Sequence, residues 1–190
     1  AQQIALFDSL ADGKSEQHCL ANSAGIIAWP KGHGEWVRPG LMLYGVSPML
    51  NSIGQQHGLE PVMRLTTRVI AIRDVDANQC VGYGGRWHSD KPTKLAVVAM
   101  GYGDGYPRHA REGTPVLVRG QRSQLLGRVS MDMLSIDITH IPEVRMGDTV
   151  TLWGESLSAN EVARWADTIG YELVTRMPLR VPKTYILSET

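Results

Sequence analysis

The feature that most constrains the fold is a change in hydrophobic periodicity after Pro61. Over residues 63–73 apolar side chains recur at alternate positions, which is typical of a strand with one buried face. Many short strands separated by glycine, proline or charged residues predict an antiparallel sheet or barrel. We therefore expect a mainly β domain over residues 61–190. Its further strands are predicted at 94–100, 114–119, 123–129, 133–139, 149–153 and 183–187.

One helix is expected within this β-rich part. Ser158 and Glu161 form a Ser-x-x-Glu capping box, and apolar residues at helical spacing continue to Ile169. Gly170 then offers a stop signal. The sequence therefore predicts a capped helix at 158–169.

Residues 1–50 have a different character. Ile4, Phe7 and Ala11 lie at helical spacing, and short apolar segments follow further along the chain. Such alternation is typical of an α/β layer. Residues 51–60 contain glycines and polar side chains, so we interpret them as a linker.

Composition excludes several classes of protein. The chain has 19 basic and 19 acidic residues, whereas proteins that bind nucleic acid usually carry a basic excess. No apolar run approaches the ~20 residues that a membrane span needs. Cys19 and Cys80 form no close pair, and the histidines lack ligand spacing, so we expect reduced thiols in a cytoplasmic protein without a metal site.

The glycine-rich segment 101–108, GYGDGYPR, follows an expected strand. A dinucleotide-binding loop would need glycine at position 106 and a helix after it, but Tyr106 and Pro107 occupy these positions. The segment is interpreted as a tight loop. It carries Tyr102 and Asp104 among its glycines, and dense polar loops often carry function.

Two other residues and one short segment are candidates, each with two open interpretations. Tyr83, between glycines in VGYGGRW, is either a half-buried core residue or a phenol that acts as a general acid or base. Arg38 is a surface cation stacked on Trp36 or a binding residue. The segment 22–24 is an ordinary helix cap or an anion-binding turn. From these residues alone, only a β-rich protein with two tyrosine-bearing loops follows.

Taken together and in order, several motifs resemble bacterial alanine racemase: ANSA (21–24), WVRPGLMLYG (36–45), VGYGGRW (81–87), AMGYGDGYPR (99–108), GRVSMDM (127–133) and RVPKTY (180–185). That family uses pyridoxal 5′-phosphate, PLP, and pairs an α/β (TIM-like) barrel with a C-terminal β-domain in a homodimer. The resemblance implies that residues 1–50 are a remnant of the barrel and that 61–190 are the β-domain. Alanine is then the substrate.

The resemblance also implies roles for single residues. Tyr83 would be one of two catalytic bases, Tyr102 would line the substrate entrance, and Met131 would contact the substrate carboxylate. Arg38 would face the pyridine nitrogen and, as a permanent cation, keep it unprotonated. The implied cofactor-binding residues are Asn22, Ser23, Arg38, Gly40, Leu41 and Tyr185.

Two departures from the family pattern stand out. The lysine that holds PLP and acts as the second base belongs to a motif absent from this chain, so we expect a C-terminal fragment that is inactive alone. Cys19 stands where the family often has a histidine. Two alternatives remain: a broad-specificity amino-acid racemase, and a non-catalytic β-domain that dimerises.

Overall fold

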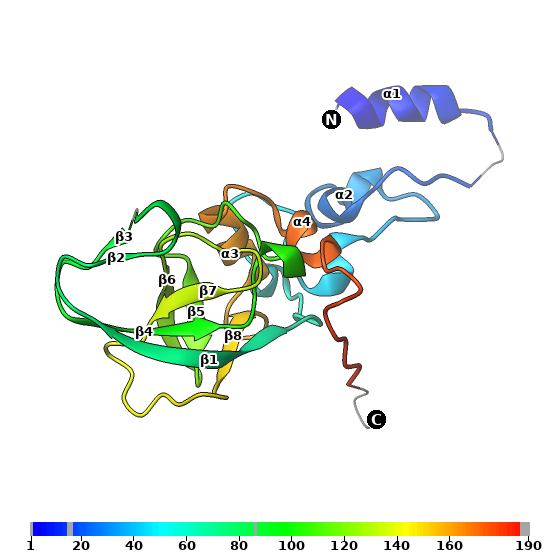
Figure 1. Ribbon diagram of the computed structural model, residues 1–190. Coiled ribbons are helices and arrows are strands. Elements are labelled where there is room, and N and C mark those ends of the chain that lie inside the picture. The colour runs from blue at the N-terminus through cyan, green and yellow to red at the C-terminus, as the bar shows by residue number, and fades with distance from the viewer. Residues whose placement is uncertain (1, 15–16, 86, 187–190) are drawn as a thin grey trace. The chain divides into compact units, whose positions relative to one another are not determined.

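The computed structural model describes residues 2–14, 17–85 and 87–186, and for Tyr83 it describes the backbone but not the side chain. The chain divides into two compact units, Ala1–Val62 and Met63–Thr190 (Figure 1). Each unit is considered by itself. No described helix combines the length and the apolar character that a bilayer crossing requires.

The first unit consists of short helices joined by extended segments. Its elements are α1 (Gln2–Ala11), α2 (Ser23–Ala28), η1 (Pro30–Gly32), η2 (Leu41–Tyr44) and η3 (Gly54–His57). The helix predicted from Ile4, Phe7 and Ala11 is present as α1. The side chain of Asn22 caps α2 by accepting a hydrogen bond from the Gly25 N–H at 3.0 Å. The stretch interpreted as a linker, 51–60, contains η3 and falls inside this unit.

The second unit is built around a closed antiparallel barrel with strand order β1-β4-β7-β6-β5-β8 (Figure 1). These strands are β1 (Leu65–Val75), β4 (Thr93–Val98), β5 (Pro115–Val118), β6 (Gln121–Leu126), β7 (Leu134–Asp137) and β8 (Thr149–Trp153). The prediction of a mainly β fold with a barrel-like second part is confirmed. Closure leaves no open sheet edge along the barrel.

Strand β1 shows why the alternating pattern forms the barrel. Leu65, Thr67 and Val69 are buried while the residues between them are exposed, as the sequence predicts. The register then shifts between Val69 and Ala71, and the alternation lapses at this bulge. The first half of β1 pairs with β8 and the second half with β4, so one long strand joins two neighbours.

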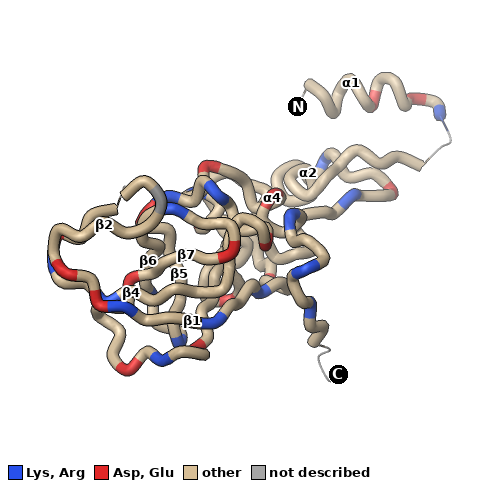
Figure 2. The backbone as a smooth tube through the Cα atoms, viewed as in Figure 1, with Lys and Arg blue, Asp and Glu red and all other residues tan. Residues whose placement is uncertain are grey.

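A small hairpin, β2 (Cys80–Val81) and β3 (Trp87–His88), extends from the barrel and holds the turn that contains Tyr83. Trp87 anchors this hairpin, because it is buried against the barrel residues Val75, Leu95 and Leu126. Figure 2 shows acidic and basic residues interspersed along the tube, which agrees with the zero net charge.

The capped helix is present but shorter than predicted. It is α3 (Ala159–Trp165), and the Ser158 side chain accepts a hydrogen bond from the Asn160 N–H. The carboxylate of Glu161 pairs with Arg122, so the reciprocal half of the capping box is not the contact observed. Asp167 has φ 49°, a left-handed conformation that ends the helical path before Ile169.

Two further sequence predictions about this region are wrong. Gly170 does not end the helix but begins the next one, α4 (Gly170–Thr175). Residues 183–186 form no strand; they are exposed and irregular, and position 187 lies outside the described residues. The barrel is already closed without them, so no open edge is left with which they could pair.

Candidate functional site

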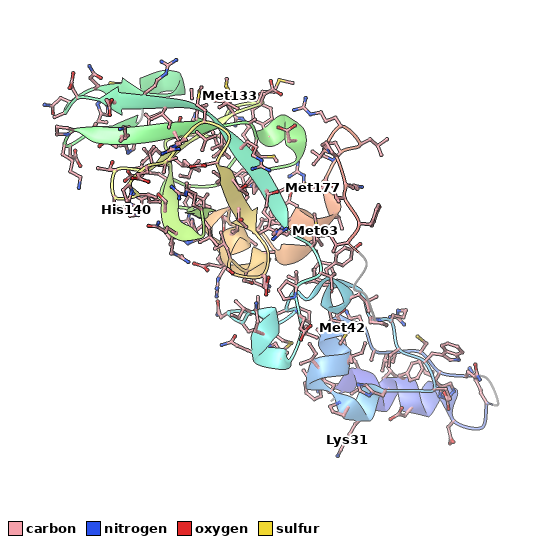
Figure 3. The ribbon with its side chains drawn as sticks, turned by 90° about the horizontal axis from the view of Figure 1, so that it is seen from below. Lys31, Met42, Met63, Met133, His140 and Met177 are labelled. Carbon is pink, nitrogen blue, oxygen red and sulfur yellow. The ribbon has the colours of Figure 1, made fainter. Side chains whose placement is uncertain are left out.

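The first unit gathers five of the predicted site residues into one group, called here the Ser23–Arg38 cluster: Asn22, Ser23, Arg38, Gly40 and Leu41. Ser23 is 1% exposed, and its Oγ accepts hydrogen bonds from the N–H groups of Gly40 (2.8 Å) and Met42 (3.4 Å). Because both bonds use the oxygen as acceptor, the hydroxyl proton can still be donated. Figure 3 labels Met42, beside Leu41 in η2.

Arg38 is exposed, yet its guanidinium is held in place by the segment before α2. Nη1 donates to the Cys19 carbonyl at 2.6 Å and to Cys19 Sγ at 3.4 Å, and Nη2 donates to the Leu20 carbonyl at 3.3 Å. The Arg38 backbone N–H also donates to the Ala21 carbonyl at 2.8 Å. One interpretation of the sequence is that Arg38 stacks on Trp36. The structure does not give Arg38 such a contact.

Cys19 is a residue that sequence reasoning left without a role. It supplies two of the acceptors of Arg38, a carbonyl and a thiol. The signal that could have identified it is its position, where the related family often has a histidine. Its half-buried thiol is thus part of the frame that fixes the direction of a permanent cation.

The Ser23–Arg38 cluster combines a donor hydroxyl with an oriented cation. An ideal Cβ on Gly40 would have Ser23 Oγ as its nearest neighbour at 3.8 Å, so glycine leaves space beside the hydroxyl. A cavity of about 390 Å³ in the same unit is lined by Asn22 and Gly25, but not by Ser23 or Arg38. The cluster can therefore offer hydrogen bonds and positive charge to an anionic or lone-pair-bearing ligand.

The second unit brings together two loops and the segment after α4, called here the Arg180 cluster: Tyr102, Asp104, Met131, Asp132 and Arg180. The N–H groups of Tyr102 and Gly103 donate to the carbonyls of Ser130 (3.0 Å) and Met131 (2.8 Å). Tyr102 lies in η5 (Tyr102–Asp104) and is 42% exposed, and Met131 is 53% exposed. Both predicted substrate residues are thus open to solvent on docked loops.

The two tyrosines of the 101–108 loop differ in burial, because Tyr102 is exposed and Tyr106 is buried. Tyr102 faces solvent with the Arg108 guanidinium 5.8 Å from its ring centroid. Tyr106 is 1% exposed and stacks on Trp153 with ring centroids 6.1 Å apart. Burial raises the pKa of Tyr106 far above its ordinary value. Tyr106 is therefore a core residue, and Tyr102 is the one available to a ligand.

The remaining two predicted residues, Tyr83 and Tyr185, belong to neither cluster as defined above. Tyr83 begins η4 (Tyr83–Gly85), whose Gly84 has φ 74°, and its side chain is outside the described part of the structure. Below this turn, Cys80 Sγ lies 3.3 Å from His88 Nδ1 across the hairpin. Tyr185 is 85% exposed in the irregular C-terminal segment. Among the described residues, no group of three or more metal-ligating side chains is present.

Comparison with protein families gives two matches. Residues 62–185 match the model for alanine racemase, C-terminal domain, and residues 1–48 match that for alanine racemase, N-terminal domain. Alanine racemase of Chromohalobacter salexigens is 51% identical over 100% of this chain and 52% of its own length. That of Pseudomonas taetrolens is 51% identical over 98% and 52%. The chain thus spans about half the length of the curated relatives it matches.

Solved structures agree with these matches. Biosynthetic alanine racemase from Pseudomonas aeruginosa superposes with a TM-score of 0.95 at 47% identity, over 98% of this chain and 52% of that chain. Alanine racemase from Bartonella henselae, with covalently bound pyridoxal phosphate, gives a TM-score of 0.86 at 31% identity, over 97% and 51%.

Proposed function

Because the chain belongs to the alanine racemase family, we propose that it supplies the C-terminal half of an enzyme that interconverts L-alanine and D-alanine with PLP. The observation that carries this proposal is the buried hydroxyl of Ser23 together with the held cation of Arg38, whose backbone pairs with that of Asn22, the residue before Ser23. The same proposal makes the enzyme a cytoplasmic homodimer whose D-alanine serves as a peptidoglycan precursor.

The Ser23–Arg38 cluster fits a cofactor that carries a phosphate and a pyridine ring. A phosphate accepts hydrogen bonds, and Ser23 retains a proton to donate after accepting from two N–H groups. Asn22, Gly40 and Leu41 would flank the phosphate, and Tyr185 would reach it through its hydroxyl. Arg38 would donate to the pyridine nitrogen. A guanidinium does not give up its proton, so this nitrogen would stay unprotonated.

When bound, PLP would supply an electron sink for the negative charge that develops at the α-carbon. Arg38 would weaken that sink by leaving the nitrogen uncharged, which limits side reactions and suits racemisation. Tyr83 would take the α-proton on one face through its phenolic oxygen, or return it there. The base on the other face would be the family's PLP-binding lysine. We find the motif that carries this lysine nowhere in the 190 residues.

The Arg180 cluster would handle the other end of the substrate. The backbone N–H of Met131 would bind the alanine carboxylate, and Tyr102 would narrow the entrance. Both residues lie on loops that are bonded to each other, which supports a defined shape for a small substrate. In the proposed homodimer, these residues would serve the cofactor held by the other subunit.

The test is complementation. The 190 residues would be fused behind the N-terminal half of the Chromohalobacter relative, giving a fused subunit, and assayed beside the chain alone. We expect the fused subunit to bind PLP and racemise L-alanine, and the chain alone to do neither. Tyr83→Phe should abolish most turnover, whereas Tyr171→Phe, an exposed tyrosine of α4, should not.

The outcomes separate the alternatives. A folded fused subunit that binds PLP without turning over any amino acid would make the chain a non-catalytic module. Equal turnover of alanine and of larger amino acids would indicate a broad-specificity racemase. Turnover by the isolated chain, free of host racemase, would contradict the assignment of the second base to the N-terminal half of the relatives, which these 190 residues do not cover.

A further inference from the structure

Arg180 joins two loops that lie far from it in the sequence. Its Nη2 lies 2.8 Å from Asp104 Oδ1 and 2.8 Å from Asp132 Oδ1. The hydrogen bond to Asp132, with the charge of Asp104, raises the pKa of Arg180. Without this cation, two carboxylates that approach one nitrogen would repel each other. One guanidinium therefore offsets the repulsion between these carboxylates and adds to the backbone hydrogen bonds that already join the two loops.

The backbone beneath Arg180 is shaped to receive it. A Cβ on Gly103 would lie 2.5 Å from Arg180 Nη2 and 3.0 Å from the Met131 carbonyl oxygen, so a side chain there would displace the guanidinium. Asp104 Oδ2 also accepts from the Gly101 N–H at 2.9 Å, which closes the loop on itself. Asp104 thus connects the fold of its own loop to the ion pair with Arg180.

Through these ion pairs, Arg180 also fixes the segment after α4 against the two loops. In this segment Met177, labelled in Figure 3, lies against Gly105, where an added Cβ would be 2.7 Å from Met177 Cε. Further along, the chain is irregular, and it is exposed from position 182 to Tyr185. Arg176, whose carbonyl oxygen would lie 2.6 Å from that same Cβ, Met177 and Arg180 are therefore contacts through which the described tail meets the 101–108 loop.

We propose that Arg180 is the positioning residue of the substrate side: through Asp104 and Asp132 it sets the positions of Tyr102, Met131 and the start of the tail. This inference rests on the proposed function, because Met131 must bind the substrate carboxylate for its position to matter. Arg180 itself need not touch the substrate. Its loss should weaken carboxylate binding more than it slows the proton transfer.

Removal of Arg180 changes charge as well as position, and a double variant separates the two effects. Arg180→Gln leaves both carboxylates unpaired and makes the cluster more negative, which would repel a substrate carboxylate. Arg180→Gln combined with Asp132→Asn restores the net charge of the cluster but cannot rebuild the bridge. Arg122→Gln is the matched control, since Arg122 of β6 pairs with a single carboxylate, that of Glu161 on α3, outside the Arg180 cluster.

Two measurements test the inference. In the fused subunit, Arg180→Gln should raise the KM for alanine and the inhibition constant of propanoate, which is alanine without its amino group, by about tenfold each. We expect kcat to change by less than about threefold, and the charge-matched double variant to stay impaired. In the 190-residue chain, amide hydrogen exchange at Tyr102 and Gly103 should quicken by about tenfold.

The possible results distinguish the positioning role of Arg180 from an effect of charge and from a failure of the proposed function. Unchanged KM, propanoate inhibition and amide exchange in Arg180→Gln would overturn the positioning role. Full recovery in the double variant would also overturn it, because charge alone would then explain the loss. A wild-type fused subunit that binds PLP but does not racemise alanine overturns the proposed function, and with it this role. If the wild-type fused subunit is active and the Arg180→Gln variant behaves like it, only the positioning role of Arg180 is overturned.

Discussion

Tyr106→Phe tests the structure of the barrel core most directly. Among the described residues, the Tyr106 hydroxyl has no hydrogen-bond partner although the side chain is 1% exposed. The variant removes this oxygen and keeps the ring that stacks on Trp153. An unpartnered buried polar group costs about 1–3 kcal/mol. We therefore expect the variant to be more stable at neutral pH by about 1 kcal/mol, or about 3 °C in Tm.

The pH dependence gives a second readout of the same hydroxyl. Burial raises the pKa of Tyr106 in the folded state, whereas in the unfolded chain it titrates near the ordinary value of ~10. Because the folded-state pKa is raised, the contribution of the neutral Tyr106 side chain to the free energy of unfolding is fully present below pH ~10. It is lost as the pH rises further. The wild type should therefore lose up to ~1.4 kcal/mol per pH unit relative to Tyr106→Phe above that value.

Urea unfolding followed by tryptophan fluorescence, repeated from neutral pH to above pH ~10, measures both effects. The stability gap between variant and wild type should be constant at lower pH and widen above pH ~10. Tyr171→Phe, on the exposed surface of α4, controls for the substitution at neutral pH. A Tyr106→Phe variant less stable than wild type by more than ~0.5 kcal/mol would refute the reasoning, since the hydroxyl would then have a partner.

Four further outcomes are expected. Gly101→Ala should destabilise the second unit by more than ~2 kcal/mol, because the new Cβ would lie 2.2 Å from the Met131 carbonyl oxygen; a melting curve like that of wild type would contradict this. Ser23→Ala in the fused subunit should weaken PLP binding by about tenfold or more, measured by cofactor titration, and unchanged affinity would remove Ser23 from the site. Arg38→Glu should slow racemisation and change the visible absorption of the loaded enzyme with L-alanine, whereas a wild-type rate and spectrum would make Arg38 a surface cation. Tyr83→Phe should slow single-turnover proton abstraction from one enantiomer more than from the other, and equal slowing would argue against two bases.

The sequence predicted the parts of this fold that depend on local pattern. The strand at 149–153 is present with those bounds as β8, and the alternation after Pro61 places Leu65 and Val69 in the barrel core. The cap at Ser158 was also readable, because a capping side chain bonds to a backbone N–H only a few residues away. In each case the interacting groups are neighbours in the chain, so their spacing carries the information.

Predictions failed where a segment's structure depends on a partner that is distant in the sequence. They also failed where a short motif is compatible with either the end or the start of a helix. Residues 183–186 look like a strand, but a closed barrel offers them no edge. Ile169 continues the helical pattern and Gly170 resembles a stop signal, yet the left-handed Asp167 ends the first helix earlier and Gly170 begins the next one. The family resemblance suggested roles for Ser23 and Arg38, which stay predictions, whereas the acceptors that hold Arg38 required coordinates.

The sequence by itself determined that the second part of the chain is a β structure, because a period of two commits every other side chain to one face. It could not determine which tyrosine of the 101–108 loop would be buried, since Tyr102 and Tyr106 stand in nearly the same local setting of glycines. The position of Trp153 decided that, and in the same way the approach of Arg180 to Asp104 and Asp132 decided the contacts of the loops. Such contacts depend on how the closed barrel brings remote segments together, and no local spacing of residues specifies them.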